Sequence, residues 1–259
     1  MYGFESRVNI KSDSEIAIMR EAGRLNRQTL EMVKAAIAPG VTTAELNEVA
    51  ESFQRQHGVY SPFLNYDPGN GVPFPGSICT SINEVLVHGI PGKRKLQEGD
   101  IISVDCGTVY QGFVGDAAFT VGVGEISRQA QHLIDVTAKA LEIATALMVP
   151  GNHSGDVGAA IEEYVESEGY FVTHTYTGHG VGREMHEAPQ LTNYGQRGTG
   201  FLLREGMTIA IEPMVLVGTR QTRVLADRWT VVSKNGGLTA HQKDTIAVTK
   251  DGPLVLTAL

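Results

Sequence analysis

Hydrophobic side chains recur at helical spacing in four segments of the chain, which form two successive pairs. The first pair covers residues 12–37 and 39–58, and the second covers residues 127–149 and 150–169. Apolar residues at every third or fourth position predict amphipathic helices that bury one face. Ser12 and Glu15 have the spacing of a capping box, which satisfies free N–H groups at the start of a helix. The pattern therefore predicts four helices, the first of them opening at Ser12.

The second segments of the two pairs, residues 39–58 and 150–169, repeat at a constant offset of 111 residues. After each pair comes a segment rich in β-branched residues that ends in a carboxylate, at residues 101–105 and 209–212. Such residues favour strands. We therefore predict an α+β fold of two related halves, approximately residues 12–123 and 127–249, each with two helices and an antiparallel sheet. No linker rich in proline, serine or charge separates the halves, so residues 1–259 are expected to form a single domain.

The turn signal Tyr110-Gln111-Gly112 predicts a β-hairpin in the first half. If Tyr110 and Gln111 form a two-residue loop, Asp105 lies directly opposite Asp116. Side chains in that relation lie about 4.5–5.5 Å apart, and two like charges there are destabilising. Because the flanking residues are apolar, the carboxylates need a positive partner, and a divalent cation bridged by their oxygens is one solution. A shared proton and a nearby arginine are the alternatives.

The second half supplies further metal-binding chemistry. His179 stands among three glycines, which permit backbone shapes closed to other residues and a close approach of substrate. His186 follows seven residues later, and Glu212 ends an apolar strand just before Pro213, where an unpaired carboxylate would be costly. The two aspartates, His179 and Glu212 would meet at the interface between the halves. Oxygen-rich ligation of this kind suits Mn, Fe or Co, and Zn less exclusively.

Composition narrows the class of protein. The chain has 259 residues, 42% of them hydrophobic, which is enough for a large core. A net charge of −8 and the lack of any run of Lys and Arg argue against nucleic acid as the main partner. Two cysteines make no disulfide framework and favour a reducing compartment. The apolar run at residues 208–217 is too short to span a bilayer, and the N-terminal segment has no signal-peptide pattern. We expect a cytoplasmic protein without a membrane partner.

In their order along the chain, these residues resemble the type I methionine aminopeptidases, metallopeptidases of family M24 with the pita-bread fold. The resemblance covers essentially the whole chain. It is carried by residues 81–84, residues 88–91, Asp105, Asp116, residues 177–182, residues 186–189 and residues 211–214. The Asp, Asp, His, Glu order is shared by the wider pita-bread family, whereas residues 83–91 and 212–214 point to the methionine branch.

The resemblance implies a role for each matching residue. The implied metal ligands are Asp105, Asp116, His179 and Glu212. His88 would bind the scissile peptide or shuttle a proton, and His186 would hydrogen-bond the substrate carbonyl and stabilise the tetrahedral intermediate. Glu212 would also handle the proton of the attacking water.

The resemblance also implies a pocket for the methionine side chain. Its walls would be formed by Phe63, Tyr66, Phe74, Cys79, Met185 and Trp229. Apolar and aromatic walls suit an unbranched thioether, although each of these residues taken alone is typical of an ordinary core. The segment at residues 67–73 is longer than in the family, which predicts altered access to the pocket.

One position departs from the family pattern. The last ligand of the family is a glutamate that bridges two metal ions shortly before a Thr-Ile pair. With Thr245-Ile246 as the anchor, this position is Lys243. Protonated lysine cannot ligate a metal. We therefore expect a lowered activity, unless a β-bulge lets Asp244 coordinate instead.

Charge arithmetic predicts how the site responds to Lys243. Three carboxylates and one ammonium carry a net charge of −2, which a single divalent ion balances. We predict one ion (Co, Mn, Fe or Zn) held by Asp116, His179 and Glu212, with Asp105 paired to Lys243. Two ions are expected only if Asp244 substitutes.

The leading functional prediction is an enzyme that removes N-terminal methionine from nascent polypeptides, preferably before a small residue. The resemblance implies a monomer, and the substrate implies proximity to the ribosome. A catalytically impaired pita-bread protein that binds peptide N-termini or a protein partner is the second prediction, which Lys243 favours. An aminopeptidase of altered specificity is the third, and it rests on the longer segment at residues 67–73.

Overall fold

The computed structural model describes residues 8–69 and 71–259. Within them lie the four predicted helices, α1 (Asp13–Ala36), α2 (Thr43–Gln56), α3 (Arg128–Ala146) and α4 (Ser154–Ser167). Ser12 caps α1 in the predicted capping box with Glu15, in which the Ser12 side chain accepts from Glu15 N and the Glu15 carboxylate accepts from Ser12 N. The helical periodicity was therefore sufficient to find these elements. No helix in these two ranges is long and apolar enough to cross a lipid bilayer.

Short strands and one long hairpin make up the rest of the fold. The strands are β1 (Ile78–Ile82), β2 (Val85–Val87), β3 (Ile101–Tyr110), β4 (Phe113–Gly122), β5 (Phe171–Val172), β6 (Gly178–Gly180), β7 (Glu187–Leu191), β8 (Thr208–Ile211), β9 (Met214–Leu216), β10 (Thr222–Val224), β11 (Val231–Ser233), β12 (Thr239–His241), β13 (Asp244–Thr249) and β14 (Gly252–Val255). They pair antiparallel in the orders β1-β3-β4, β10-β11-β2, β12-β9-β5 and β14-β13-β8-β6-β7.

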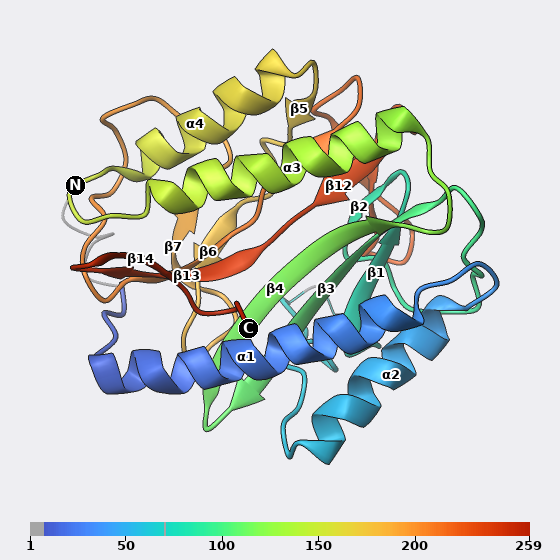
Figure 1. Ribbon diagram of the computed structural model, residues 1–259, viewed down its shortest axis with the longest axis horizontal. Helices are drawn as coiled ribbons and strands as arrows, with labels where there is room; N and C mark the ends of the chain where they lie inside the picture. The colour runs from blue at the N-terminus through green and yellow to red at the C-terminus, as the bar shows by residue number, and fades with distance from the viewer. Residues whose placement is uncertain (1–7, 70) are drawn as a thin grey trace.

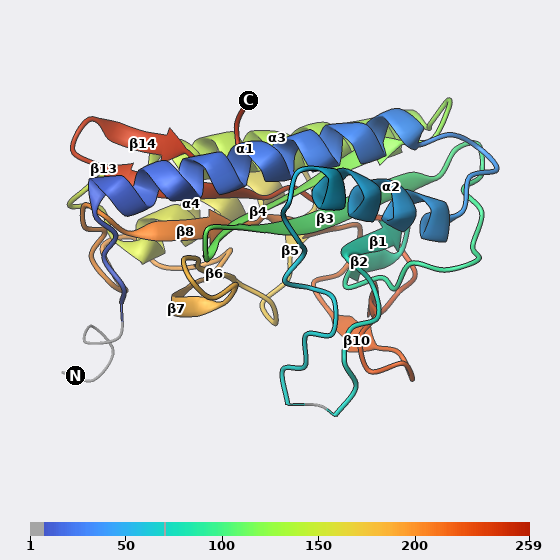
Figure 2. The same ribbon diagram turned by 90° about the horizontal axis from the view of Figure 1, so that it is seen from below.

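The helices form a layer over one face of the strands. Helices α1 and α2 lie beside β1, β3 and β4, and helices α3 and α4 lie on the side of β12 (Figure 1). Seen at right angles, the helices occupy one side of the molecule, while β7, β10 and long loops project from the other side (Figure 2). Apolar residues such as Leu30, Val104, Leu133 and Ile209 fill the space between helices and strands. The opposite face of the strands is thereby left for polar side chains.

The hairpin of β3 and β4 has a different register from the predicted one. Tyr110 pairs with Phe113, so the two-residue loop is Gln111-Gly112 and not Tyr110-Gln111. Both loop residues have positive φ, which a two-residue turn of type I′ requires and which glycine adopts without strain. Asp105 consequently pairs with Ala118, and the prediction that it faces Asp116 directly was wrong. The two carboxylates lie on the same face of the sheet as diagonal neighbours.

A ladder of paired residues joins the hairpin to the C-terminal strands. Cys79 pairs with Asp105, Asp105 with Ala118, and Ala118 with Lys243. Lys243 N donates to Ala118 O over 3.0 Å, and Ala118 N donates to Lys243 O over 3.1 Å. Because paired residues project to the same face, Lys243 is directed to the face that carries both aspartates. The register of β8 and β13 brings the residue after β8, Glu212, next to Lys243.

Candidate active site

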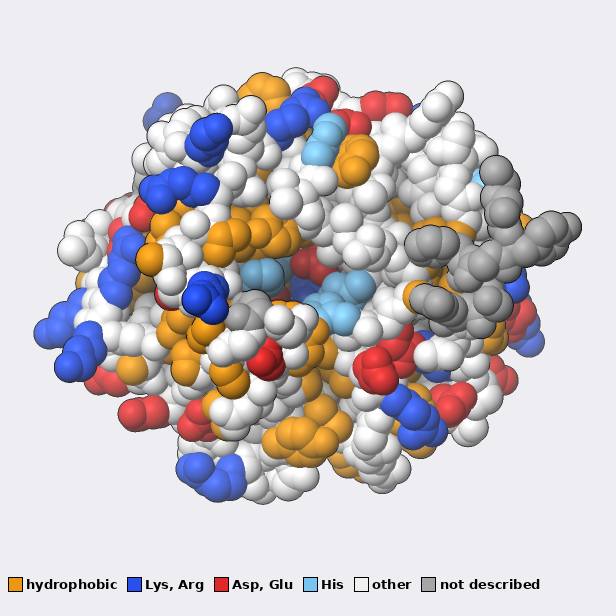
Figure 3. Space-filling view, turned by 180° about the vertical axis from the view of Figure 1, so that it is seen from behind, with side chains coloured by type: hydrophobic (Ala, Val, Ile, Leu, Met, Phe, Trp, Pro, Cys, Tyr) orange, Lys and Arg blue, Asp and Glu red, His pale blue; other side chains and the backbone are white. Residues whose placement is uncertain are grey.

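A cavity of about 480 Å³ opens on the face opposite the helix layer (Figure 3). In Figure 3 this hollow shows histidine side chains at its edges, acidic and basic side chains at its base, and apolar side chains around it. Its lining contains nearly every residue predicted for the site, from both halves of the chain. Asp116 does not line it, because the residue is fully buried next to Lys243, and Asp244 does not line it either.

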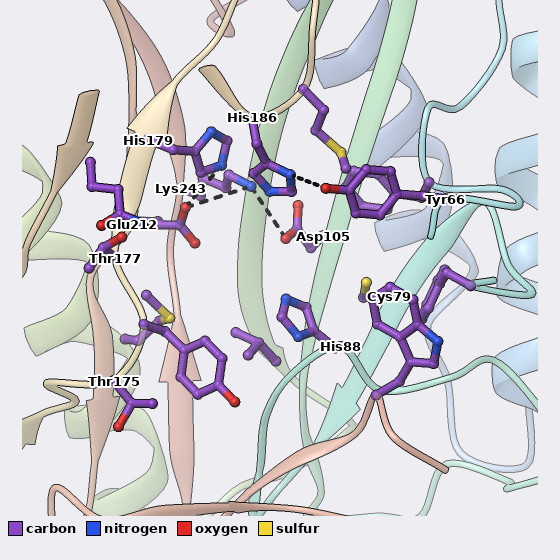
Figure 4. Close-up of a pocket in the computed structure, with 18 of the residues that line it drawn as sticks. Tyr66, Cys79, His88, Asp105, Thr175, Thr177, His179, His186, Glu212 and Lys243 are labelled. Carbon is purple, nitrogen blue, oxygen red and sulfur yellow. Dashed lines mark hydrogen bonds and ion pairs between the residues drawn. The ribbon is translucent and has the colours of Figure 1, made fainter. Parts of the chain in front are cut away.

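Five of the lining or adjacent residues form a charged wall, defined here as Asp105, Asp116, His179, Glu212 and Lys243. The Lys243 ammonium lies 3.5 Å from Asp105 Oδ2 and 3.9 Å from Glu212 Oε1 (Figure 4). It lies 2.7 Å from Asp116 Oδ2. Lys243 therefore stands at the predicted bridging position. The predicted pairing of Lys243 with Asp105 is present, and the ammonium lies closer still to Asp116. The pairing of Lys243 with Ala118 directs the lysine side chain to the face of the sheet that carries both aspartates. The ammonium therefore contacts both carboxylates.

Burial and charge act against each other in this wall. Burial lowers the pKa of Lys243, but the carboxylates of Asp105, Asp116 and Glu212 raise it above its ordinary value, so the ammonium is retained. Burial raises the pKa of Asp105, and the neighbouring Asp116 adds to this, while Lys243 opposes it. For Glu212 burial is outweighed by Lys243 and the histidines, which lower its pKa to about 2. Glu212 is therefore a carboxylate at neutral pH.

His179 is prepared to act as a ligand. Its Nδ1 lies 3.0 Å from Gly180 O, and because a carbonyl only accepts, Nδ1 carries the proton. The other nitrogen, Nε2, is left with its lone pair, 3.3 Å from Glu212 Oε1 and 3.5 Å from Asp116 Oδ2. Nε2, Asp116 Oδ1 and Asp105 Oδ1 are buried without a hydrogen-bond partner, whereas Asp116 Oδ2 is paired with the Lys243 ammonium. Buried polar atoms of this kind require a partner, and these converge on one place.

Asp116, His179 and Glu212 supply donor atoms suited to a divalent ion. In the described ranges, no group of three or more His, Cys, Asp or Glu side chains is arranged to hold a metal ion as it stands. His179 Nε2 lies 3.5 Å from Asp116 Oδ2 and 3.3 Å from Glu212 Oε1, close to the roughly 3.0–3.4 Å that separates two ligand atoms about 2.1 Å from one ion. The Lys243 ammonium lies between Asp105 and Asp116 and contacts both carboxylates.

Asp244 is not available as a substitute ligand. Its Oδ1 accepts hydrogen bonds from Arg27 Nη2 and from Thr257 Oγ1, both at 2.6 Å. Asp244 pairs with Ile211 in an unbroken register, so no bulge turns it toward the cavity. Successive residues of a strand point to opposite faces, and Lys243 already points into the cavity. The prediction that Asp244 replaces the bridging ligand was wrong.

Two neutral histidines face the cavity beside the charged wall. Burial lowers the pKa of His88 to about 4. Burial and the neighbouring His179 lower the pKa of His186 to about 4 as well. His88 has a positive φ of 61° and meets Trp229 edge to face at 6.1 Å between ring centroids. His186 Nδ1 lies 3.0 Å from the Tyr66 hydroxyl. Neutral imidazoles in these places can donate or accept one hydrogen bond to a bound peptide.

The opposite side of the cavity is an apolar wall, which consists of the six residues predicted for the methionine pocket: Phe63, Tyr66, Phe74, Cys79, Met185 and Trp229. Phe74 and Trp229 pack edge to face with 5.1 Å between ring centroids. Trp229 Nε1 donates to Val72 O over 2.8 Å, which satisfies its one polar group. The sequence therefore predicted which residues assemble here, and their role in binding methionine stays a prediction.

Sequence reasoning missed two features of the site. His241 is buried with its Nε2 3.2 Å from Glu212 Oε2. The sequence contained a pattern that could have identified His241. It precedes Lys243 by two residues, and alternate residues of an extended segment share a face. The second feature is a buried ion pair of Lys11 with Glu187 at 2.6 Å, at the rim of the cavity. These residues are 176 positions apart, and no local pattern connects them.

Comparison with known proteins agrees with this geometry. The sequence pattern of metallopeptidase family M24 matches residues 17–250. The chain therefore belongs to this family of metallopeptidases. Membership of the family implies that the protein depends on a divalent metal.

Within the family, the similarity is to methionine aminopeptidases. The chain is 49% identical to the methionine aminopeptidase of Clostridium acetobutylicum over 249 residues, which cover 96% of this chain and 98% of that protein. It is 46% identical to methionine aminopeptidase 1 of Bacillus subtilis over 247 residues, which cover 95% of this chain and 98% of that one. The crystal structure of the methionine aminopeptidase from Rickettsia prowazekii superimposes with a TM-score of 0.94 at 38% identity, covering 97% of this chain and all of that chain. The resemblance and the pita-bread fold predicted from the sequence are confirmed.

Proposed function

We propose that this chain is a metal-dependent aminopeptidase that removes the N-terminal methionine of newly made polypeptides, preferably before a small residue. The observation that carries the proposal is the single cavity with an apolar wall on one side and a charged wall on the other. An unbranched thioether fits the apolar wall, and the amino group and scissile peptide of the same residue would then lie at the charged wall. The proposal includes action in the cytoplasm, close to the ribosome, as a monomer.

The residues have distinct tasks in this proposal. Asp116, His179 and Glu212 would hold one divalent ion (Co, Mn, Fe or Zn), which supplies a bound water of lowered pKa as nucleophile. Glu212, a carboxylate with a pKa near 2, accepts hydrogen bonds and orients the polar groups around it. His186 donates to the substrate carbonyl, and His88 contacts the peptide nitrogen.

Lys243 takes the place of the second ion as a fixed positive charge between Asp105 and Asp116. An ammonium carries one positive charge where a divalent ion carries two, and it offers no site for a water ligand. We therefore propose a working enzyme with one ion per chain and a lower rate than a two-ion centre.

A titration tests the proposal directly. Mn, Fe or Co is added to the metal-free protein while the hydrolysis of the peptide Met-Ala-Ser is followed, with Lys243→Glu as the matched variant. We expect activity that saturates at one metal per chain, and saturation at two in Lys243→Glu. Saturation of the unmodified protein at two would refute the part given to Lys243.

The second candidate function is a protein that binds peptide N-termini without cleaving them. It is favoured by Lys243 at a ligand position and by the contact of this ammonium with both aspartates. This function requires that the unmodified chain shows no turnover with any metal and that Lys243→Glu shows turnover. It also requires that the unmodified chain binds Met-Ala-Ser equally tightly with and without metal.

A further inference from the structure

We propose that Tyr66 is a positioning residue that fixes the tautomer and orientation of His186, a role that rests on the proposed aminopeptidase function. The Tyr66 hydroxyl lies 3.0 Å from His186 Nδ1. In Figure 4 the His186 ring stands between Tyr66 on one side and the Lys243 ammonium on the other, with Asp105 below it. The two ring nitrogens lie on different sides of an imidazole, so Nε2 is turned toward the charged wall.

The geometry of the pair assigns the donor. Burial raises the pKa of Tyr66, so its hydroxyl keeps its proton. His186 Nδ1, 3.0 Å away, is the acceptor within reach of this hydroxyl. Lys243 and the carboxylates of Asp116 and Glu212 act on the ring in opposite directions, so they do not select a tautomer. Donation by the hydroxyl to Nδ1 leaves the one proton of a neutral imidazole on Nε2.

This tautomer is the one that the proposed reaction needs. An Nε2–H directed into the cavity can donate to the carbonyl oxygen of a bound peptide, whereas a lone pair would repel it. With the other tautomer, the donor would point at Tyr66 and away from the substrate. Tyr66 thus acts on the substrate through His186. In the same way, a residue that hydrogen-bonds the second nitrogen of a metal-bound histidine fixes the tautomer and orientation of that ring.

The position of Tyr66 does not depend on its bond to His186. Tyr66 N donates to Phe63 O over 3.0 Å, and Tyr66 O accepts from Phe74 N over 2.8 Å, so both of its backbone groups are fixed. Its ring packs in the apolar wall, with its centroid 6.5 Å from that of Trp229. Replacement by phenylalanine therefore removes the hydroxyl and leaves the ring in place.

Nitrogen NMR of the metal-free protein with ¹⁵N-labelled histidine tests the tautomer, with His186 assigned by its loss in His186→Gln. We expect an unprotonated Nδ1 and a protonated Nε2 in the unmodified chain, and a mixture of both tautomers in Tyr66→Phe. Tyr60→Phe serves as the control, because Tyr60 is 63% exposed and does not line the cavity. A proton on Nδ1 in the unmodified chain, or an unchanged spectrum in Tyr66→Phe, overturns the proposal.

Kinetics separate positioning from packing. With Met-Ala-Ser, Tyr66→Phe is expected to lower kcat roughly 10–100-fold at an almost unchanged KM. A rise in KM alone would mean that the hydroxyl only helps to bind the methionine side chain, and would overturn the proposal. If no variant cleaves any peptide while the tautomer changes as expected, the proposed function fails and the role of Tyr66 stands.

Discussion

The two walls of the cavity are held by different physical means. The apolar wall comes largely from loops, since Phe63, Tyr66 and Phe74 precede β1 and Trp229 precedes β11. Its members are fixed by contact with each other and by the bond of Trp229 to the backbone. The charged wall comes from strands or their ends, and its members are fixed by register.

This difference explains why a side chain of the charged wall cannot avoid its neighbours. Loops can shift to accept a new apolar side chain. Lys243 cannot turn away, because its pairing with Ala118 directs it at the carboxylates. The charged wall therefore holds an ammonium among three carboxylates, while the apolar wall is built from uncharged side chains. Binding of substrate and rate of reaction should be separable in this chain.

Lys243→Met should have the largest effect, because it leaves three buried carboxylates without their ammonium. The metal-free variant is expected to lose about 3–5 kcal/mol in free energy of unfolding, the cost of removing one partner of a buried ion pair. Denaturant unfolding with and without Mn measures this, and Lys250→Met, at an exposed position, is the control. An ion can neutralise the carboxylates, so added Mn should restore more stability to Lys243→Met than to the unmodified chain. Equal stability of variant and unmodified chain would mean that the ammonium is not needed there.

Trp229→Ala should affect substrate binding and leave the charged wall intact. Loss of the indole removes a face of the apolar wall and its bond to Val72 O. We expect kcat/KM for Met-Ala-Ser to fall about 100-fold, or ~3 kcal/mol, through KM. Calorimetric titration with Mn should give the same affinity as in the unmodified chain. A parallel loss of metal affinity would show that the two walls are coupled.

The elements that carry a strong local pattern were predictable from sequence. Helical spacing and the Ser12–Glu15 capping box predicted α1 to within one residue at each end, and helical spacing predicted α2, α3 and α4 to within about four residues. The Thr245-Ile246 anchor identified Lys243, because the register between β13 and β8 is regular. The members of the apolar wall came from the family resemblance, since nothing in an isolated Phe or Trp distinguishes a pocket from a core.

The features that failed depend on register or on distant contacts. The predicted turn after β3 was displaced by one residue, because the loop consists of Gln111 and Gly112, which both have positive φ. This displacement gave Asp105 the wrong cross-strand neighbour in the prediction. From the sequence, Asp244 was a candidate substitute ligand. The fold shows that its carboxylate accepts hydrogen bonds from Arg27 and Thr257. The partner of Lys11 is Glu187, which no spacing rule connects to it.

Glu187→Gln should have a smaller, pH-dependent effect at the rim of the cavity. Both side chains of the pair with Lys11 are about 5% exposed, and the bond from Lys11 outweighs burial and lowers the pKa of Glu187. A lowered folded-state pKa stabilises the protein above the unfolded pKa and ceases to do so as pH falls through the folded value. The variant should lose about 2 kcal/mol at neutral pH. Unfolding measured at about pH 3 should show a much smaller difference, and a constant difference would contradict the assignment.

Met185→Leu should have the smallest effect and is the finest test of the difference between the walls. Both side chains are apolar and similar in volume, and such exchanges usually cost less than about 1.5 kcal/mol. Leucine is branched, however, so the cavity should lose some fit for an unbranched substrate side chain. We expect a decrease of a few-fold in kcat/KM for Met-Ala-Ser, with an equal decrease for the peptide that begins with norleucine, and an unchanged melting temperature. A decrease in kcat/KM as large as that expected for Trp229→Ala would contradict the difference between the walls. It would mean that the apolar wall tolerates substitution no better than the charged wall, whose residues are fixed by strand register.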